Sequence, residues 1–578
     1  MKNAEIARLF AEMAQLLEIK GESVFRVRAY ERAAQNIESL GEDIAAVAGR
    51  GELGKVPGIG KGLATHVGEY LASGAIAELD AIRKEVPRGL LSLLELRGLG
   101  PKTAKLLYDR LGIDSVEKLE RAARSGDILE VPGVREKTRE NILKALQTYR
   151  AGQVRLPLGR ALVIADEIVA RLSTTGAVDA IEVAGSARRR RETVGDLDVL
   201  VTSRDPHRVI ETFVGLPAVT ARLARGDTKA SVIHGAGAGG LTIQVDLRVV
   251  EPAAYGAALQ YFTGSKDHNV RLRELAQRKG LKISEYGVFS ESSGARVAGG
   301  TEAEVYEAVG LPWIPPELRE NAGEIEAALA GRLPALVELG DLRGDLHAHT
   351  DWSDGRLPLA QLVAEAEARG YEYVIVSDHS RSSTVAGGLG PDELREQIQA
   401  IRTLQKKHKV RILAGSECDI LADGRLDFPD DVLKELDVVL AAVHSRFKQP
   451  RPEMTARIVR AIENPYVNIL VHPTGRLIGE REPYDVDLEQ VFAAARSHGK
   501  AVEINSSWQR LDLKDSHARR AAELGVPIAI SSDTHDPSHL DNLALGVATA
   551  RRAWIGPHQV VNTLPLKRLL AWAHRGRR

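Results

Sequence analysis

The chain has 578 residues, which is too long for one hydrophobic core and predicts three to five domains. Its composition, 44% hydrophobic and 27% charged, is ordinary for a soluble globular protein, and no apolar run reaches the roughly 20 residues that span a bilayer. The net charge of −1 hides a mildly basic half, +6 over residues 1–300 (44 Lys and Arg against 38 Asp and Glu), and an acidic half, −7 over 301–578 (34 against 41), so we expect a polyanion to bind mainly to the first.

Two further counts bear on location and chemistry. The first residues lack a signal-peptide pattern, and Cys418 is the only cysteine, so we expect a cytoplasmic protein without internal disulfides or a membrane partner. Of the 16 histidines, 12 lie beyond residue 340, a concentration that predicts metal ligands there.

Residues 1–152 show short helical patterns, which we divide into domains at 1–85 and 86–152. A glycine turn recurs at spacings of about 35 to 40 residues, as Val56–Gly62, Leu96–Lys102 and Val131–Arg135, the last without the second glycine. Free N–H groups at the helix start after such a turn form an anion site, as in the helix-hairpin-helix repeat that binds DNA phosphates. A purely structural repeat is the alternative. The candidate DNA-binding residues are Gly58, Gly60, Gly98, Gly100, Lys102 and Gly133.

From residue 153 onward, helical and strand-like patterns alternate. The expected strands are Ala180–Val183, Asp196–Val201, Val232–Ile233 and Thr242–Val249. The first strand leads into Gly185-Ser186 and an arginine cluster, which predicts a backbone cradle for phosphate.

Three acids on these strands form a candidate metal site. Asp196 and Asp198 lie two apart on one strand and therefore face the same way. Neighbouring carboxylates repel each other unless a cation such as Mg²⁺ lies between them. Asp246 is costly to bury within an apolar strand unless it is paired or metal-bound, so we expect it to be the third carboxylate. Solvated acids at a strand end are the alternative, which the cradle upstream disfavours.

These residues, with Tyr261–Ser265, resemble the family X DNA polymerases, the group that includes DNA polymerase beta, over residues 1 to about 315. The resemblance implies a nucleotidyltransferase palm at 153–254 and a nucleotide-selecting thumb at 255–316. It implies that Asp196 and Asp198 hold two Mg²⁺ or Mn²⁺ ions, with Asp246 on the ion that activates the primer 3′-hydroxyl. It also implies a monomer that binds gapped or primer-template DNA and dNTPs. The residues implied to contact the nucleotide are Gly185, Ser186, Arg189, Gly195, Tyr261, Phe262, Gly264, Asn269 and Arg273.

Three positions depart from the family pattern. Val194 stands in place of a phosphate-binding serine, and Gln244 replaces an arginine near the third aspartate. His66 occupies the position of the Schiff-base lysine. Because an imidazole cannot form that imine, we do not expect deoxyribose-phosphate lyase activity unless Lys61 or Lys55 substitutes.

Prolines and an acidic helix at Glu317–Ala330 predict a linker at 317–339. From residue 340 to 578, seven short apolar runs alternate with helical segments, which predicts a parallel, distorted (β/α)7 barrel. Six histidines and three carboxylates follow these runs, at the strand ends where such barrels gather their chemistry. These candidate metal ligands are His347, His349, Asp354, His379, Glu417, His444, His472, Asp533 and His535.

This set resembles the polymerase and histidinol phosphatase (PHP) domain. The resemblance implies up to three bound ions, for which mixed imidazole and carboxylate ligands permit Mn²⁺, Zn²⁺ or Fe. It also implies a phosphoesterase that acts as a 3′–5′ exonuclease, with 3′-phosphatase or abasic-site endonuclease action as further candidates.

The sequence thus predicts a multidomain α/β protein: a helical N-terminal region, an α+β palm with a thumb, and a C-terminal barrel. Its expected function is template-directed gap filling in DNA repair, such as base excision repair, with an intrinsic metal-dependent nuclease. The alternative is a template-independent nucleotidyltransferase fused to a small-molecule phosphoesterase, which has no use for DNA-binding hairpins. A non-enzymatic DNA-binding scaffold is a third interpretation, which the two complete ligand sets disfavour.

Overall fold

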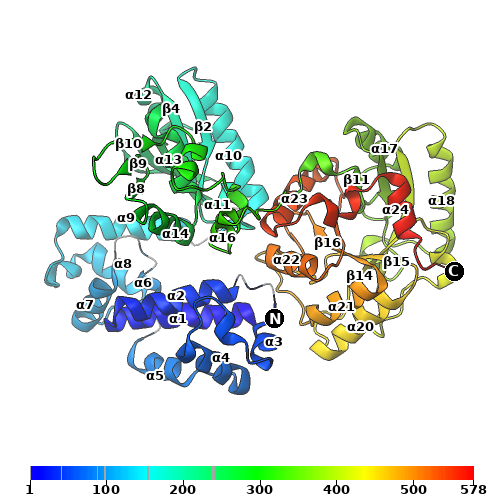
Figure 1. Ribbon diagram of the computed structural model, residues 1–578, viewed down its shortest axis with the longest axis horizontal. Helices are drawn as coiled ribbons and strands as arrows, with labels where there is room; N and C mark the ends of the chain where they lie inside the picture. Colours follow the sequence, from blue (N-terminus) through cyan, green and yellow to red (C-terminus); the bar gives the residue numbers. More distant parts are fainter. Residues whose placement is uncertain are drawn as a thin grey trace.

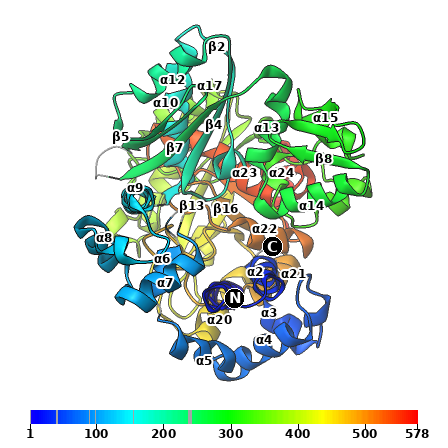
Figure 2. The same cartoon turned by 90° about the vertical axis from the view of Figure 1, so that its left-hand side faces the viewer.

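The computed structural model describes residues 2–38, 40, 42–87, 89–94, 96, 99–152, 155–235 and 241–577. The helical N-terminal region and the palm with its thumb lie on one side of the molecule, and the PHP region lies on the other (Figure 1). Turning the view by 90° places the N-terminal helices below the palm sheet (Figure 2).

The N-terminal region is entirely helical in its described residues. One hydrophobic cluster contains buried residues from Ile6 to Leu146, so both predicted N-terminal domains share a core. The elements are α1 (Asn3–Lys20), α2 (Val24–Glu38), α3 (Ile44–Gly49), η1 (Leu53–Lys55), α4 (Lys61–Ser73), α5 (Ala77–Glu85), α6 (Gly89–Leu94), α7 (Pro101–Leu111), α8 (Val116–Ser125), η2 (Asp127–Glu130) and α9 (Glu136–Gly152).

The palm is built on a sheet with the strand order β2-β4-β7-β6-β5. Its strands are β2 (Val178–Val183), β4 (Asp196–Ser203), β5 (Val219–Arg225), β6 (Lys229–Gly235) and β7 (Thr242–Val249). Only β4 and β7 pair in parallel. Strand β5 was not predicted, because most of its side chains are exposed and its sequence carries no apolar run.

Further short elements complete the palm. They are β1 (Leu156–Pro157), α10 (Leu158–Ser173), α11 (Gly185–Arg188), β3 (Thr193–Val194), α12 (Pro206–Val214) and η3 (Pro252–Ala254). Helices α10 and α12 pack against the sheet, and Leu197, Val199 and Leu247 are fully buried beneath them.

The thumb contains α13 (Tyr255–Thr263), α14 (Lys266–Gln277), β8 (Leu281–Ser284), β9 (Gly287–Ser290), β10 (Arg296–Ala298) and α15 (Glu302–Ala308). The acidic helix predicted at Glu317–Ala330 is wrong in extent, since only η4 (Pro316–Leu318) and the short α16 (Glu324–Leu329) form. Gly323 adopts a left-handed conformation directly before α16 and separates the two. Leu318 and Ile325 are buried in the thumb core, so this segment packs as part of the thumb.

The C-terminal region confirms the predicted barrel. Its seven strands pair in parallel and in chain order, and an isolated parallel bridge between Ala348 and Thr534 joins the segments that follow the first and last strands, so the barrel is nearly closed. The strands are β11 (Gly344–Asp345), β12 (Tyr373–Val376), β13 (Arg411–Asp419), β14 (Val438–Ala442), β15 (Val467–Leu470), β16 (Ala501–Asn505) and β17 (Ile528–Ser531).

Helices surround this barrel and close one end. They are η5 (Leu339–Asp341), α17 (Leu359–Ala368), η6 (Thr384–Ala386), α18 (Pro391–Gln405), α19 (Asp430–Leu433), α20 (Arg451–Glu463), α21 (Leu488–His498), α22 (Asp515–Glu523), η7 (Pro537–Asn542), α23 (Leu543–Arg552), η8 (Pro557–Gln559), η9 (Val561–Thr563) and α24 (Leu566–Ala573). Val374 and Val376 of β12 pack in one cluster and Ile375 in another, as the alternation of strand side chains requires.

The palm rests directly on the barrel region. Leu511 and Leu545 belong to the palm's hydrophobic cluster although they come from the C-terminal part of the chain. A β-carbon on Gly159 of α10 would lie 2.6 Å from Cβ of Trp508, so the two backbones approach closely. The guanidinium of Arg160 lies 4.8 Å from the centre of the Trp508 ring. The palm and the barrel region are therefore in direct apolar contact.

Candidate metal centres and DNA-binding turns

The three palm carboxylates lie on the same face of two neighbouring strands. Asp198 of β4 stands in register with Asp246 of β7, and Asp196 stands in register with Gln244. In-register residues of parallel strands point to the same side of a sheet. Asp246 is buried, Asp198 half-buried and Asp196 exposed, so the group reaches from the sheet to solvent.

Gln244 holds the buried carboxylate of Asp246. Its Nε2 lies 3.1 Å from both carboxylate oxygens of Asp246 and 3.3 Å from Oγ of Ser231. An amide orients the carboxylate but adds no positive charge, unlike the arginine of the family pattern. Hard divalent cations such as Mg²⁺ or Mn²⁺ prefer carboxylate oxygens as ligands, so this cluster of acids fits such ions.

The phosphate cradle lies against the second aspartate. The backbone N–H of Ala184 donates to the carbonyl oxygen of Asp198 at 2.7 Å. Gly185 has φ +66°, and a β-carbon there would lie 2.9 Å from Oδ2 of Asp198. Ser186 lies in the short helix α11 that follows, and Gly195 approaches Nη1 of Arg155, where a β-carbon would lie at 3.1 Å. Only glycine leaves the cradle and the carboxylate undisturbed.

Replacing Gly185 by alanine should therefore reduce DNA synthesis by about 10²-fold, because the new methyl group must displace Asp198 and the left-handed backbone disfavours a side chain. Steady-state primer extension measures the effect, and nuclease activity should not change. Gly176→Ala is the matched control, since Gly176 has φ +68° but no atom within 4 Å of its β-carbon position. Equal synthesis by the two variants would contradict the assigned contact.

The two arginines after the cradle are engaged with acids that the sequence did not single out. Arg188 donates to both carboxylate oxygens of Glu302, at 2.8 and 3.0 Å. Arg189 donates through Nε to Glu320 at 3.0 Å and through Nη1 to the carbonyl of Thr263 at 2.8 Å. These bonds join the palm to the thumb. A nucleotide contact by Arg189 stays a prediction.

Glu302 is ionised despite its burial. Burial would raise the pKa of this carboxyl, but hydrogen bonds from Arg188 and Arg319 lower it to about 2. Arg319, itself fully buried, contacts the same carboxylate. A lone acid in the amphipathic segment Glu302–Ala308 resembles any solvated residue, so no sequence signal reveals this pairing.

The predicted nucleotide-facing residues of the thumb lie around the end of α13. The rings of Tyr261 and Phe262 meet edge to face at 5.1 Å. Asn269 donates to the carbonyls of Tyr261 at 2.7 Å and Gly264 at 3.2 Å, and thus caps α13. Arg273 is exposed and donates to the carbonyl of Asn269 at 3.2 Å. Contacts of Asn269 and Arg273 with a base pair stay predictions.

All nine predicted barrel ligands gather at the carboxyl ends of the strands. The side chains of each of three groups lie close enough to share an ion, with ligand atoms within 4.8 Å of one another, and His349 and His379 each belong to two groups. His472 adjoins them, with Nε2 2.7 Å from Oε1 of Glu417. The groups are His349, Asp354, His379 and His535; His347, His349 and Asp533; and His379, Glu417 and His444.

Two further carboxylates, which were not predicted from the sequence, orient these ligands. Glu503 lies 2.8 Å from Nδ1 of His347 and accepts the backbone N–H of His472 at 2.7 Å. Asp419 lies 2.5 Å from Nδ1 of His444. Such bonds turn the opposite ring nitrogen toward a metal. Glu503 is a lone acid within an apolar strand, the same signal that identified Asp246, so it could have been predicted.

The acids of this cluster are ionised, whereas its histidines fall into two sets with lowered and raised pKa. Burial would raise the pKa of Glu417, but the positive charge of His444 beside it holds that pKa well below its usual range. Burial lowers the pKa of His379 to about 4 and that of His472 to about 3. Within the described part of the chain, the buried Nδ1 atoms of His349 and His472 have no hydrogen-bond partner. Neighbouring carboxylates instead raise the pKa of His444 to about 10 and that of His535 to about 9, despite their burial. Metals bind ionised carboxylates and neutral imidazoles, so these two histidines would release a proton as ions bind, and the donor set fits a multi-metal site.

Replacing Glu503 by glutamine should weaken metal retention about 10- to 100-fold, the usual cost of removing a carboxylate that supports a metal-binding histidine. The measurement is the metal content of the protein after dialysis against graded chelator concentrations. Glu489→Gln, which removes a carboxylate bonded to Arg520 at 2.9 Å on the barrel's outer helices, is the control. If both variants retain metal equally, Glu503 does not support the site.

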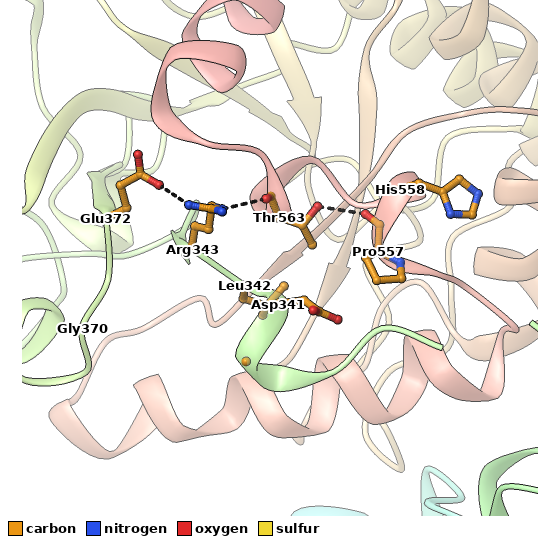
Figure 3. Close-up of a pocket in the computed structure, with 9 residues that line it drawn as sticks. Asp341, Leu342, Arg343, Gly370, Glu372, Pro557, His558 and Thr563 are labelled. Atoms are coloured by element: carbon orange, nitrogen blue, oxygen red, sulfur yellow. Dashed lines mark hydrogen bonds and ion pairs between the residues drawn. The ribbon is translucent and has the colours of Figure 1, made fainter. Parts of the chain in front are cut away.

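A polar pocket of about 590 Å³ lies at the opposite end of the same strands (Figure 3). Arg343, which precedes β11, pairs with Glu372, which precedes β12, at 3.0 Å. Arg343 also donates to the carbonyl of Thr563 at 3.1 Å. The pocket is therefore separate from the ligand cluster, which follows the strands.

The three glycine turns share one backbone hydrogen bond. The backbone N–H of Ile59 donates to Val56, that of Leu99 to Leu96, and that of Val134 to Val131, at 3.0 to 3.1 Å. Gly58 and Gly133 have φ +79° and +85°, and Gly60 and Gly100 lie directly before α4 and α7. Gly98 and the side chain of Lys102 lie outside the described residues. The third turn thus matches the first in this bond and in its positive-φ glycine, although it lacks the second glycine.

The position of the family's lyase lysine holds a histidine with two partners. Nδ1 of His66 lies 3.0 Å from the hydroxyl of Tyr30, and Nε2 lies 3.3 Å from Glu78. Lys55 pairs with Glu52 at 2.6 Å, and Lys61 begins α4. Lack of lyase activity stays a prediction. In the described ranges, no helix combines the length and apolar character that crossing a membrane requires.

Family models match four parts of the chain. A helix-hairpin-helix domain matches residues 1–76, a SAM-like helix-hairpin-helix tandem 90–148, the DNA polymerase beta thumb 258–320 and the PHP domain 345–507. These matches confirm the predicted helix-hairpin-helix, thumb and PHP assignments.

Individual proteins extend the similarity over the whole chain. DNA polymerase lambda of Rattus norvegicus is 28% identical over 344 residues, 55% of this chain and 56% of its own. A probable phosphatase of Thermoanaerobacter sp. (strain X514) is 31% identical over 231 residues, 38% of this chain and 89% of its own. The DNA polymerase/3′-5′ exonuclease PolX of Bacillus subtilis (strain 168) is 39% identical over 580 residues and 100% of both chains. The chain therefore belongs to the bacterial PolX family, which joins a family X DNA polymerase to a C-terminal PHP domain.

Proposed function

We propose that this protein fills short gaps in DNA in a template-directed way during repair, and that its PHP domain removes nucleotides from the 3′ end. The observation that carries the polymerase assignment is the in-register pair Asp198 and Asp246 beside the Gly185 cradle. The family match over the whole chain supports both activities.

In the polymerase centre, the chain's own residues hold and orient the reactants. Asp196 and Asp198 would hold two divalent ions, and Asp246, kept in place by Gln244, would share the ion beside the primer terminus. The ions supply charge neutralisation and activation of the 3′-hydroxyl. Backbone N–H groups at the start of α11, with Ser186 and Arg189, would bind the triphosphate in line with that hydroxyl.

In the PHP centre, the nine ligands would hold up to three ions, which supply an activated water and neutralise phosphate charge. Glu503 and Asp419 fix the imidazole orientations. Arg510 lies at the same cluster, with Nε 3.5 Å from Oδ2 of Asp533 and its side chain 20% exposed. We propose that Arg510 binds the substrate phosphate, because a planar guanidinium can donate two parallel hydrogen bonds to phosphate oxygens.

Gapped DNA is the proposed partner. The three hairpin turns would bind phosphates through backbone N–H groups, without reading bases. The competing assignment is an enzyme that acts on small molecules, and such an enzyme would have no use for DNA-binding turns.

Primer extension on one-nucleotide-gapped DNA, with each dNTP supplied separately, tests the proposal. We expect the nucleotide complementary to the template to be added preferentially, and little addition to a single strand that has no template. Addition of all four nucleotides at equal rates, with or without a template, would favour a template-independent transferase.

A further inference from the structure

One arginine of the PHP domain reaches the polymerase's phosphate-binding loop. Arg552, the last residue of α23, has a side chain that is only 5% exposed. Its Nη1 donates to the backbone carbonyl of Arg189 at 2.8 Å and to Oε1 of Glu320 at 3.0 Å. On its other side, Nε donates to Asp515 at 2.8 Å within the PHP domain.

Arg189 is therefore held twice by the same guanidinium. Its backbone carbonyl accepts directly from Arg552, and its own guanidinium donates to Glu320, the carboxylate that Arg552 also contacts. Burial raises the pKa of Glu320, but the charges of Arg552 and Arg189 outweigh this and keep it below its usual value. The result is a buried charge network in which each arginine has a carboxylate partner.

A second PHP arginine holds the loop three residues further on. Arg476, which is 8% exposed, pairs with Glu192 at 2.8 Å. The segment from Arg189 to Glu192 connects the Gly185 cradle to β3 and then to Asp196. The PHP domain thus contacts both ends of the stretch that joins the phosphate cradle to the catalytic aspartates.

The apolar contact between the palm and the PHP domain fixes where these hydrogen bonds form. Leu511, Leu545 and Trp508 of the PHP domain pack into the palm cluster beside α10. Because packed apolar surfaces fix the separation of the two backbones, the guanidinium of Arg552 reaches Arg189 in one defined place.

We propose that Arg552, on the nuclease domain, is a positioning residue for nucleotide binding by the polymerase domain: it holds Arg189 and the loop to Glu192 in the form that receives the triphosphate. The inference rests on the proposed polymerase function. The nuclease domain then serves as part of the scaffold of the polymerase site, besides carrying its own centre.

The full-length Arg552→Gln variant tests this inference. Loss of a charged hydrogen bond to the loop should raise the KM for dNTP about tenfold, while kcat on gapped DNA changes less than about twofold, because the contact acts on binding rather than on the reacting atoms. Nuclease activity and metal content should equal those of the unmodified protein. Arg552→Lys, which keeps one charge but cannot reach three acceptors, should give an intermediate KM.

Arg551→Gln is the matched control. Arg551 neighbours Arg552 on the same helix and also crosses the domain boundary, but it donates to Glu317 at 2.7 Å and to the carbonyl of Val337 at 3.2 Å. We expect its KM for dNTP to match that of the unmodified protein. If Arg552→Gln and Arg551→Gln have the same KM, the inference is wrong.

Asp515→Asn provides a second route if the Arg552→Gln protein does not fold. This change leaves Arg552 charged but removes its anchor within the PHP domain, and it should raise the KM for dNTP by about threefold. An unchanged KM in this variant would also overturn the inference. Synthesis by the unmodified protein is measured first, so absence of any templated synthesis would count against the proposed function instead.

Discussion

Replacing Asp196 by alanine is expected to reduce DNA synthesis by at least about 10³-fold and to leave 3′–5′ degradation unchanged. Asp196 is one of two carboxylates that would hold both ions of the polymerase centre. Losing it removes several kcal/mol of stabilisation of the transferring phosphate, and each 1.36 kcal/mol corresponds to a tenfold rate change.

Single-turnover extension of a labelled primer on gapped DNA measures this effect. Degradation of a labelled single strand from its 3′ end is measured on the same preparation. Asp166→Ala is the control, because Asp166 is an exposed acid on α10 of the same palm. Synthesis by Asp196→Ala within about tenfold of the control would remove Asp196 from the catalytic centre. Loss of degradation as well would show that one centre performs both reactions.

Replacing His349 by alanine is expected to impair 3′–5′ degradation rather than DNA synthesis. His349 belongs to two of the three ligand groups, so its loss disturbs more than one ion position. We expect degradation to fall by at least about 10³-fold, because a misplaced ion cannot neutralise the phosphate charge or activate water. Templated synthesis should be unchanged, because Asp196, Asp198 and Asp246 come from a different domain.

The metal content of the purified variant, measured by mass spectrometry, separates loss of ions from loss of chemistry alone. His408→Ala is the control, since His408 lies in the same domain, in the loop after α18, and pairs with Glu367 of α17 at 3.0 Å. A His349→Ala protein that degrades DNA as fast as the control would refute the assignment. Equal loss in both variants would indicate general destabilisation of the barrel.

Sequence reasoning was most successful where function depends on residues that are close in the chain. The spacing of Asp196 and Asp198 places both on one strand face, and the parallel register with β7 then brings Asp246 beside them. Apart from Asp354, the barrel ligands each lie at the end of a short apolar run, because a strand of a parallel sheet is buried on both faces and delivers the next residue to the open end.

Elements with weak local signals were missed or misjudged. Strand β5 is mostly exposed and has no apolar run to mark it. The segment after Pro316 has helical composition, but Leu318 and Ile325 are drawn into the thumb core and a left-handed Gly323 divides it. In both cases packing against distant residues decides the local conformation, which propensity alone cannot predict.

The sequence by itself determined the family, the barrel and the two sets of candidate metal ligands, because apolar periodicity and ligand chemistry are local properties of the chain. Only the tertiary structure decided the partners of the charged residues: Glu320, 131 residues from Arg189, and Arg552, 363 residues away. A guanidinium or carboxylate has the same sequence signature whether it faces solvent or a buried counter-ion. Its role follows from which surfaces the folded domains bring together, and burial then strengthens that one pairing over all others.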